Sequence, residues 1–293
     1  MSDDEKQIRA LVERWTEAVH RGDLDTVLAD HARDIVMYDV PPPYQGVRGI
    51  DAYRETWPPF FRWQASGGSF EIETLEITAG VDVAFANALL RCGTPADFAA
   101  NPANRLRLTL GLRKENGRWV VAHEHHSFPL VDEDPAGDSG TADGPGVAGD
   151  SGAAEREVLG VHERWSAAAA AKDLDGLMSV IADDVVSYEH EAPLEYVGAE
   201  TVREVCARNL DAGGAAVTFD TPDLRVLVQG DLAVSWGLNH VRVVPAGGEP
   251  VDNWSRGTRV FQRRDGRWWL IHQHVSVPLD RSTGAARTDL RPR

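Results

Sequence analysis

The chain has 293 residues and a formal net charge of −16, from 30 Lys and Arg against 46 Asp and Glu. This length predicts about two domains, each large enough to bury its own core. An acidic surface repels phosphate backbones and anionic lipid, so we expect neither nucleic acid nor a membrane as a partner. Apolar runs stay far below the roughly 18 residues of a membrane span, and residues 1–7 are too polar for a signal peptide. We therefore expect a cytoplasmic protein, with Cys92 and Cys206 as reduced thiols.

The sequence repeats itself at an offset of 149 or 150 residues. The run His123, His125 and Ser127 recurs as His272, His274 and Ser276, and Glu13-Arg14-Trp15 recurs as Glu163-Arg164-Trp165. A repeat of this length indicates a duplicated domain, because solenoid units are only about 20 to 50 residues long. We predict one domain at 1–130, a flexible acidic linker rich in Gly, Asp and Ser at 131–154, a second domain at 155–280 and a disordered tail at 281–293.

Helical elements come first in each copy. Apolar residues at helical spacing predict a first helix whose buried face carries Ile8, Leu11, Val12, Trp15 and Val19. Gly22 is placed to end this helix, and 23–29 follows as a short second helix. A strand at 35–39 precedes a third helix at 50–62, which Pro58 and Pro59 should break or kink. Copy two repeats the first helical face at Val158, Val161, Trp165 and Ala169, the strand at 185–189 and the third helix at 199–210.

Strands fill the rest of each copy. In copy one we predict them at 69–78, 83–92, 105–114 and 118–128, with Asn116-Gly117 as a hairpin turn. Asp265-Gly266 is predicted to form the same hairpin turn in copy two. Helices followed by long antiparallel strands favour an α+β fold, in which a curved sheet wraps around a helical layer.

Three motifs resemble a known family. They are Gly-Asp-Leu-Asp at 22–25, Asp-x-x-x-Tyr-Asp at 34–39 and the closing Gly-Arg-Trp followed by His-x-His-x-Ser-x-Pro. They resemble the SnoaL-like, ketosteroid-isomerase-like branch of the nuclear-transport-factor-like superfamily, over both copies. The resemblance implies two tandem cone-shaped α+β domains, each with three helices on a curved, mainly antiparallel sheet around an apolar pocket. Because such domains commonly pair through their sheets, it also implies an internal pseudo-dimer, and a further homodimer stays open.

Asp39 is the most specific catalytic candidate. Ile35, Met37 and Asp39 share one strand face, so the carboxylate continues an apolar row and is expected at the mouth of a pocket. Such surroundings make a carboxyl a usable general base. By the resemblance, Asp39 matches the proton-shuttling aspartate of ketosteroid isomerase, and Glu189 is its counterpart. The alternative is a solvated acid at the end of a strand.

The His-x-His strands supply the second group of candidates. His123 and His125 share a face with Ser127, as His272 and His274 do with Ser276. We expect His125 and His274 to act as proton donors or orienters beside the carboxylates, and His123 and His272 to line the pocket. Metal binding and a structural role are the alternatives, but a metal needs a third ligand, and we expect neither metal nor cofactor. His126, whose counterpart is Val275, is expected to face the other side of the sheet and to matter less.

Other side chains are expected to hold the substrate. Trp15 and Trp165 occupy the position of the isomerase tyrosine, and Thr109 and Thr258 that of its protonated acid, so each offers one hydrogen-bond donor in place of the missing oxyanion hole. Arg107 and Arg256 are expected to bind a substrate carboxylate or an internal acid such as Asp39 or Glu124. Lining positions complete the predicted sites: Tyr38, Trp57 and Phe61 in copy one, and Tyr188 in copy two.

The resemblance and these residues together predict a function. The first hypothesis is a cofactor-independent, SnoaL-like enzyme of secondary metabolism that moves protons on a small, hydrophobic carbonyl compound, by isomerisation, dehydration or aldol-type cyclisation. That substrate is anionic if Arg107 binds it. The second hypothesis is a non-catalytic ligand-binding or assembly module, because fold does not fix function.

Overall fold

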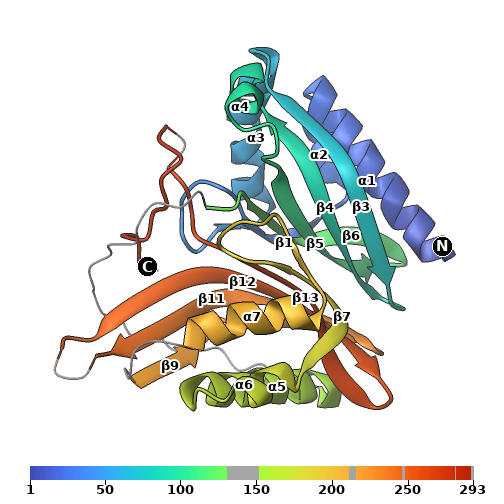
Figure 1. Cartoon of the computed structure of the whole chain (residues 1–293). Helices are drawn as coiled ribbons and strands as arrows, with labels where there is room; N and C mark the ends of the chain where they lie inside the picture. Colours follow the sequence, from blue (N-terminus) through green and yellow to red (C-terminus); the bar gives the residue numbers. More distant parts are fainter. Residues whose placement is uncertain (131–151, 211–215, 246–247, 281, 292–293) are drawn as a thin grey trace. The chain divides into compact units, whose positions relative to one another are not determined.

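The computed structural model describes residues 1–130, 152–210, 216–245, 248–280 and 282–291 (Figure 1). It divides into two compact units, unit one at Met1–Phe128 and unit two at Pro129–Arg293, and each has its own hydrophobic core. Each unit is an α+β domain, as the element order predicted. In these described ranges no helix is long and apolar enough to cross a membrane.

Unit one is a six-stranded sheet with helices against it. Its elements are α1 (Asp3–Arg21), α2 (Leu24–Ala29), β1 (His31–Tyr38), β2 (Val47–Arg48), α3 (Ile50–Ala65), β3 (Ser69–Ala79), β4 (Val83–Gly93), α4 (Pro95–Ala100), β5 (Leu106–Glu115) and β6 (Arg118–Ser127). The strand order is β2-β1-β6-β5-β4-β3, antiparallel except for the parallel pair β1 and β6. In Figure 1, α1 runs along β3.

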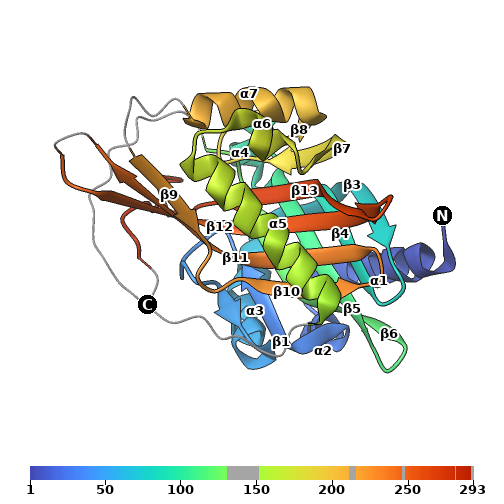
Figure 2. The same ribbon diagram turned by 90° about the horizontal axis from the view of Figure 1, so that it is seen from below.

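Unit two repeats this plan. Its elements are α5 (Ala153–Ala170), α6 (Leu174–Met178), β7 (Ile181–Tyr188), β8 (Tyr196–Val197), α7 (Ala199–Leu210), β9 (Ala216–Asp220), β10 (Arg225–Gln229), β11 (Leu232–Val244), β12 (Val251–Arg264) and β13 (Arg267–Ser276). The strand order is β10-β11-β12-β13-β7-β8, and β9 also pairs with β11. Figure 2 shows α5 crossing the strands of this sheet.

Local sequence explains how the first helix begins and ends. Ser2 and Glu5 form a capping box that satisfies free N–H groups at the start of α1. All five residues of the predicted apolar face are buried. Gly22 ends the helix at φ 65°, a left-handed conformation that glycine adopts without steric cost.

The hairpin turns are confirmed. Asn116 and Gly117 have φ values of 51° and 78°, and Asp265 and Gly266 have 51° and 77°. Two successive positive φ values characterise the type I′ turn, whose twist matches that of the flanking strands. The turns therefore fix the register of β5 with β6 and of β12 with β13.

The structure excludes one of the two outcomes expected at the prolines of the third helix. The helix is not broken, because α3 continues through Pro58 and Pro59 to Ala65. The carbonyls that lose a bond belong to the exposed residues Arg54 and Glu55, where water can hydrate them. Near the C-terminal end, Asp280 accepts hydrogen bonds from the N–H groups of Ser282 and Thr283, and short turns lie at 282–283 and 288–289. The disorder of the tail stays a prediction. Most of the predicted linker, 131–151, lies outside the described residues, and α5 begins at Ala153.

Each sheet has two faces, and the face that packs against the helices is here called the inner face. In unit one, Leu108 and Leu110 lie on it, in the same core cluster as Trp15 and Trp57. Their cross-strand partners on β6 are His126 and Glu124. Side chains alternate along a strand, so His126 and Glu124 belong to the inner face and their neighbours to the opposite face.

Candidate functional site

A group of ionisable side chains, here called the inner cluster, lies on the inner face of unit one. It consists of His31, Asp39, Tyr53, Glu124 and His126. Glu124 is central and its side chain is fully buried. Its Oε1 accepts a hydrogen bond from Tyr53 Oη at 2.8 Å and lies 2.8 Å from His31 Nε2, which is 3.1 Å from the same Tyr53 Oη. β1, α3 and β6 thus bring three buried polar groups to one point.

The inner cluster reaches outward through His126. The second oxygen of Glu124, Oε2, lies 3.4 Å from His126 Nε2, and His126 Nδ1 lies 3.7 Å from Asp39 Oδ1. The Asp39 side chain is 22% exposed, whereas that of His126 is 8% exposed. A line of alternating charges therefore runs from a buried carboxylate, through an imidazole, to a carboxylate that solvent reaches.

The surroundings favour charged forms in this line. Burial lowers the pKa of His126, but the Asp39 and Glu124 carboxylates outweigh it, so the pKa is raised overall. Burial likewise raises the pKa of Glu124, but the hydrogen bond from His31 and the nearby imidazoles leave it lowered overall. For Tyr53, burial and the charge of Glu124 raise the phenol pKa well above its ordinary value. Tyr53 is therefore a neutral donor, between a carboxylate and the aromatic core.

Two indoles border the buried end of the inner cluster. The ring centroids of Trp15 and Trp57 are 6.0 Å apart, and Trp57 lies 5.6 Å from Tyr53. Nε1 of each indole is buried and makes no hydrogen bond of good geometry among the described residues. Both indoles nevertheless act as weak donors toward the Tyr53 phenol, where they oppose the rise of its pKa. Phe61, another predicted lining residue, is partly buried against the same core.

The structure corrects the predicted grouping of Asp39 with the repeated histidines. Tyr38 pairs with His125 across β1 and β6, and its ring lies 5.2 Å from both His123 and His125. These three side chains are on the face opposite to Asp39, because Asp39 follows Tyr38 directly and strand side chains alternate. The expectation that His125 acts beside the Asp39 carboxylate is therefore wrong.

Arg107 and Thr109 lie on the same opposite face. Thr109 pairs with His125, and Arg107 donates to Ser127 Oγ from Nε at 3.0 Å and from Nη2 at 2.8 Å. Both residues are fully buried. The expectation that Arg107 binds Asp39 or Glu124 is wrong, because the sheet separates them.

Unit two shows the same division. Tyr188 lies 5.2 Å from His274 and 5.0 Å from His272, and Thr258 pairs with His274, with Arg256 two residues before it on the same face. Glu189 is on the inner face, where it accepts hydrogen bonds from Gln273 Nε2 at 3.0 Å and from Ser187. Trp165 of α5 lies on that inner side as well. Glu189 is thus also separated from His274.

Four members of the inner cluster were missed from the sequence: His31, Tyr53, Glu124 and His126. Their counterparts in unit two are Ile181, Val202, Gln273 and Val275. His126 does face away from His123 and His125, as predicted, but the conclusion that it matters less is wrong because it contacts Asp39. The signal that could have identified these four residues is a difference between the copies. Each position holds an ionisable residue in unit one and a non-ionisable residue in unit two.

In the part of the chain that the structure describes, no group of three or more His, Cys, Asp or Glu side chains is arranged to hold a metal ion. The His31, Asp39, Glu124 and His126 side chains of the inner cluster instead contact one another in a line.

The fold and the inner face define a class of protein, a tandem pair of cone-shaped α+β domains with helices against a curved sheet. The family model described as the SnoaL-like domain matches residues 8–131 and again residues 158–280. The chain therefore belongs to the SnoaL-like family, as a duplication. This membership supports a small-molecule-binding or isomerase-type domain.

Solved structures of NTF2-like proteins are similar to parts of the chain. An NTF2-like protein of unknown function from Pseudomonas putida KT2440 is 32% identical, and the match covers 49% of this chain and 100% of that one, with a TM-score of 0.45. The association domain of CaMKII from C. elegans is 22% identical, over 43% of this chain and 96% of that one, with a TM-score of 0.38. No curated protein matches the chain.

Proposed function

We propose that unit one is a cofactor-independent enzyme that transfers a proton on a small, hydrophobic carbonyl compound, with Asp39 as the general base. The observation that carries this proposal is the line from Asp39 through His126 to Glu124, with separations of 3.7 and 3.4 Å. A partly exposed carboxylate beside an imidazolium is held as the anion, which is the form that a general base needs.

The chemistry begins at the carbon next to the carbonyl. Asp39 takes a proton from this carbon, the bonding electrons remain on the substrate as an enolate, and return of the proton elsewhere completes an isomerisation. Departure of a β-hydroxyl group as water, with the proton returned by Asp39, gives a dehydration. Attack of the enolate carbon on a second carbonyl, whose oxygen takes that proton, gives a cyclisation. His126 is a positioning residue, whose cation orients Asp39 and responds to its protonation.

The duplication supports a functional origin of the inner cluster. A buried charge network is costly to assemble, and apolar residues of similar volume often stabilise a core at least as well. Unit two has Ile181, Val202 and Val275 at three of the corresponding positions and retains the fold. Packing alone therefore does not require the network in unit one.

The wider setting of this proposal rests on composition for the compartment, and on the resemblance to SnoaL-like enzymes for the pathway and the substrate class. We assign the activity to the cytoplasm and to secondary metabolism, with a hydrophobic carbonyl compound as substrate. The non-catalytic alternative, a ligand-binding or assembly module, predicts binding without turnover.

Exchange of carbon-bound hydrogen tests the proposal without knowledge of the natural substrate. The full chain is incubated in D₂O with a panel of small cyclic and aryl ketones, and loss of the α-proton signal is followed by ¹H NMR. We expect exchange above the buffer rate, and a decrease of about 100-fold or more in Asp39→Asn, the range typical of a lost general base. Circular dichroism checks that the variant is folded.

Glu189→Gln is the matched control, because it removes the corresponding carboxylate of unit two. Its exchange rate should equal that of the unmodified protein. Equal rates in Asp39→Asn and the unmodified protein would contradict the assignment of Asp39. Ketone binding without exchange above the buffer rate would favour the binding module instead.

A further inference from the structure

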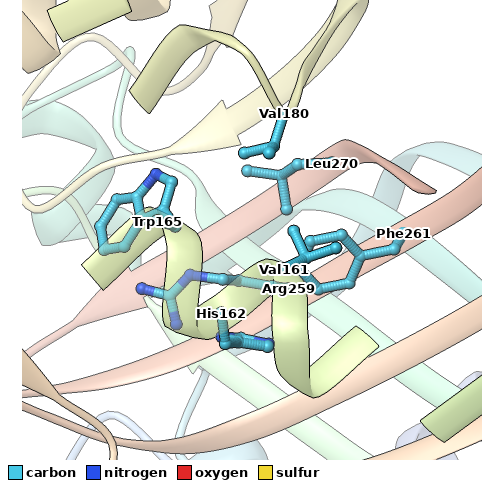
Figure 3. Close-up of a pocket in the computed structure, with 7 residues that line it drawn as sticks. All are labelled: Val161, His162, Trp165, Val180, Arg259, Phe261 and Leu270. Atoms are coloured by element: carbon cyan, nitrogen blue, oxygen red, sulfur yellow. The ribbon is translucent and has the colours of Figure 1, made fainter. Parts of the chain in front are cut away.

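The inner face of unit two carries a buried guanidinium where unit one is apolar. Arg259 on β12 is 4% exposed, and its Nε donates to Gln273 Oε1 at 3.0 Å while its Nη1 donates to Asn239 Oδ1 at 3.0 Å. Figure 3 shows its guanidinium end between Trp165 and His162. Two amide oxygens thus hold the fork of Arg259 in a fixed orientation.

Neither amide neutralises the charge. The acid that acts on Arg259, Glu189, accepts hydrogen bonds from Gln273 and Ser187. Within the described ranges, Nη2 of Arg259 makes no hydrogen bond, and no carboxylate lies within ion-pair distance of the guanidinium. Burial lowers the pKa of Arg259 to about 10, which still leaves it cationic at neutral pH. A buried cation without a direct counter-ion is costly, so an anion that binds here would offset that cost.

An apolar cavity lies beside the guanidinium. It is lined by Val161, His162, Trp165, Val180, Arg259, Phe261 and Leu270, and it has room for about one ordered water molecule. Trp165 is the most exposed of these residues, so its ring forms the side of the cavity nearest to solvent. Arg259 lies 5.2 Å from the Trp165 ring and 5.7 Å from the Phe219 ring. An apolar group fits these walls better than a hydrated one.

Unit one is an internal comparison for this site. The positions that correspond to Arg259, Asn239 and Gly257 hold Leu110, Leu90 and Leu108, which are all buried core residues. A Cβ on Gly257 would lie 2.7 Å from the Asn239 amide and 3.0 Å from Arg259 Nη1. Glycine at 257 therefore leaves the space in which Asn239 meets Arg259. Three leucines fill the same region of the duplicate, so the fold itself does not need the polar group.

We propose that unit two binds a small monocarboxylate, with its carboxylate on Arg259 and its apolar tail beside Trp165, where the ligand displaces the Trp165 ring and so widens the cavity. The free N–H groups of Nη2 match a carboxylate oxygen, and a charge-assisted bond of this kind is among the stronger hydrogen bonds. A dianionic phosphate would carry a second charge into apolar walls, and chloride would leave those walls unused. This site does not depend on the activity proposed for unit one.

Calorimetry with the full chain tests the site. Acetate, butanoate and benzoate are titrated at constant chloride, and the corresponding primary amides serve as neutral ligands of the same shape. We expect the carboxylates to bind, the amides to bind at least ten-fold more weakly, and Arg259→Met to lose carboxylate binding by at least ten-fold. Arg259→Lys keeps the charge but lacks the fork, so we expect an intermediate loss.

Two controls separate this site from other effects. Arg264→Gln removes a positive charge from the same strand, at an exposed pair with Asp184, and should bind carboxylates normally. Thermal unfolding of Arg259→Met without ligand should show at least the stability of the unmodified protein, because a methionine suits an apolar wall. Strong destabilisation by Arg259→Met, equal binding of amides and carboxylates, or competition by chloride at equal concentration would each overturn the proposal.

Discussion

Glu124 shows at the scale of one residue how a buried charge is tolerated. Its carboxylate is fully buried, yet Tyr53 and His31 satisfy one oxygen and His126 faces the other. Removing one partner from such a group leaves the rest uncompensated, which typically costs about 3–5 kcal/mol. The stability of unit one should therefore depend on the protonation of His126 and Glu124.

The pH dependence of that contribution has a defined window. The pKa of folded His126 is raised above 6.5, so its stabilisation is complete below pH 6.5 and is lost as pH rises through the folded value. The pKa of folded Glu124 is lowered below 4.5, so its stabilisation is present above pH 4.5 and is lost as pH falls through the folded value. Both contributions are present together between pH 4.5 and 6.5.

We predict that His126→Gln lowers the free energy of unfolding by about 1–3 kcal/mol in this window, and by clearly less once the pH has risen through the folded pKa of His126, where the imidazole is neutral in both folded and unfolded chains. Urea denaturation of both proteins at about pH 5.5 and about pH 9 measures the difference. A loss of stability that is the same at both pH values would contradict the predicted charge on His126.

Residue by residue, the sequence predicted the fold better than the site. The repeated residues, such as His125 and His274, lie on the face of each sheet that is turned away from the helices. The inner cluster uses positions that differ between the copies, such as Glu124 and Gln273. Residues that are the same in both copies indicate what both domains need. A chemistry that only one domain performs must use residues that differ between the copies. Period-two alternation from Tyr38 would have placed Asp39 opposite His125, but only the strand pairing supplies the relative phase of β1 and β6.

Whole elements were predicted closely where short-range chemistry decides their limits. The Asn116-Gly117 turn fixes a hairpin whose strands begin and end within one residue of the predicted bounds. By contrast, α3 passes through Pro58 and Pro59, because the buried aromatic side chains of this helix, such as Trp57, add tertiary packing that local propensity does not include.

The two first helices offer a matched comparison of their ends. Unit one has Gly22 at φ 65°, and the corresponding residue of unit two, Lys172, has φ 55°. A residue with a Cβ is destabilised by about 1–2 kcal/mol in this left-handed conformation. Glycine avoids that steric cost, but it loses more backbone entropy on folding, which offsets about 0.5–1 kcal/mol of its advantage. Because a Cβ on Gly22 would only touch Phe61 at 3.8 Å, backbone conformation dominates the comparison.

We predict that Lys172→Gly raises the free energy of unfolding by about 0.5–1 kcal/mol, and that Gly22→Ala lowers it by a similar amount. Urea denaturation measures both changes. Lys172→Ala is the control, because it removes the lysine charge but retains a Cβ at positive φ. If Lys172→Ala stabilises the protein as much as Lys172→Gly, the charge and not the backbone is responsible.

At the scale of the whole molecule, one fold carries two interiors of opposite character. Unit one places the carboxylate of Glu124 among imidazoles, and unit two places the guanidinium of Arg259 among amides. The hydrogen bonds of each group join residues of its own unit. A substitution at Glu124 or Arg259 removes hydrogen bonds to neighbouring elements of the same unit. We therefore expect the change in local stability to be confined to those elements.

Hydrogen–deuterium exchange followed by mass spectrometry tests this independence. We predict that Glu124→Gln speeds amide exchange in β1, α3 and β6, whose side chains meet at Glu124, and leaves β11, β12 and β13 unchanged. Arg259→Met should alter exchange in β11, β12 and β13, which hold Arg259, Asn239 and Gln273, and leave unit one unchanged. The double variant should show the sum of the two patterns. Faster exchange in both units from either single variant would show that the two interiors are coupled, and the duplicated domains would then act as one cooperative structure.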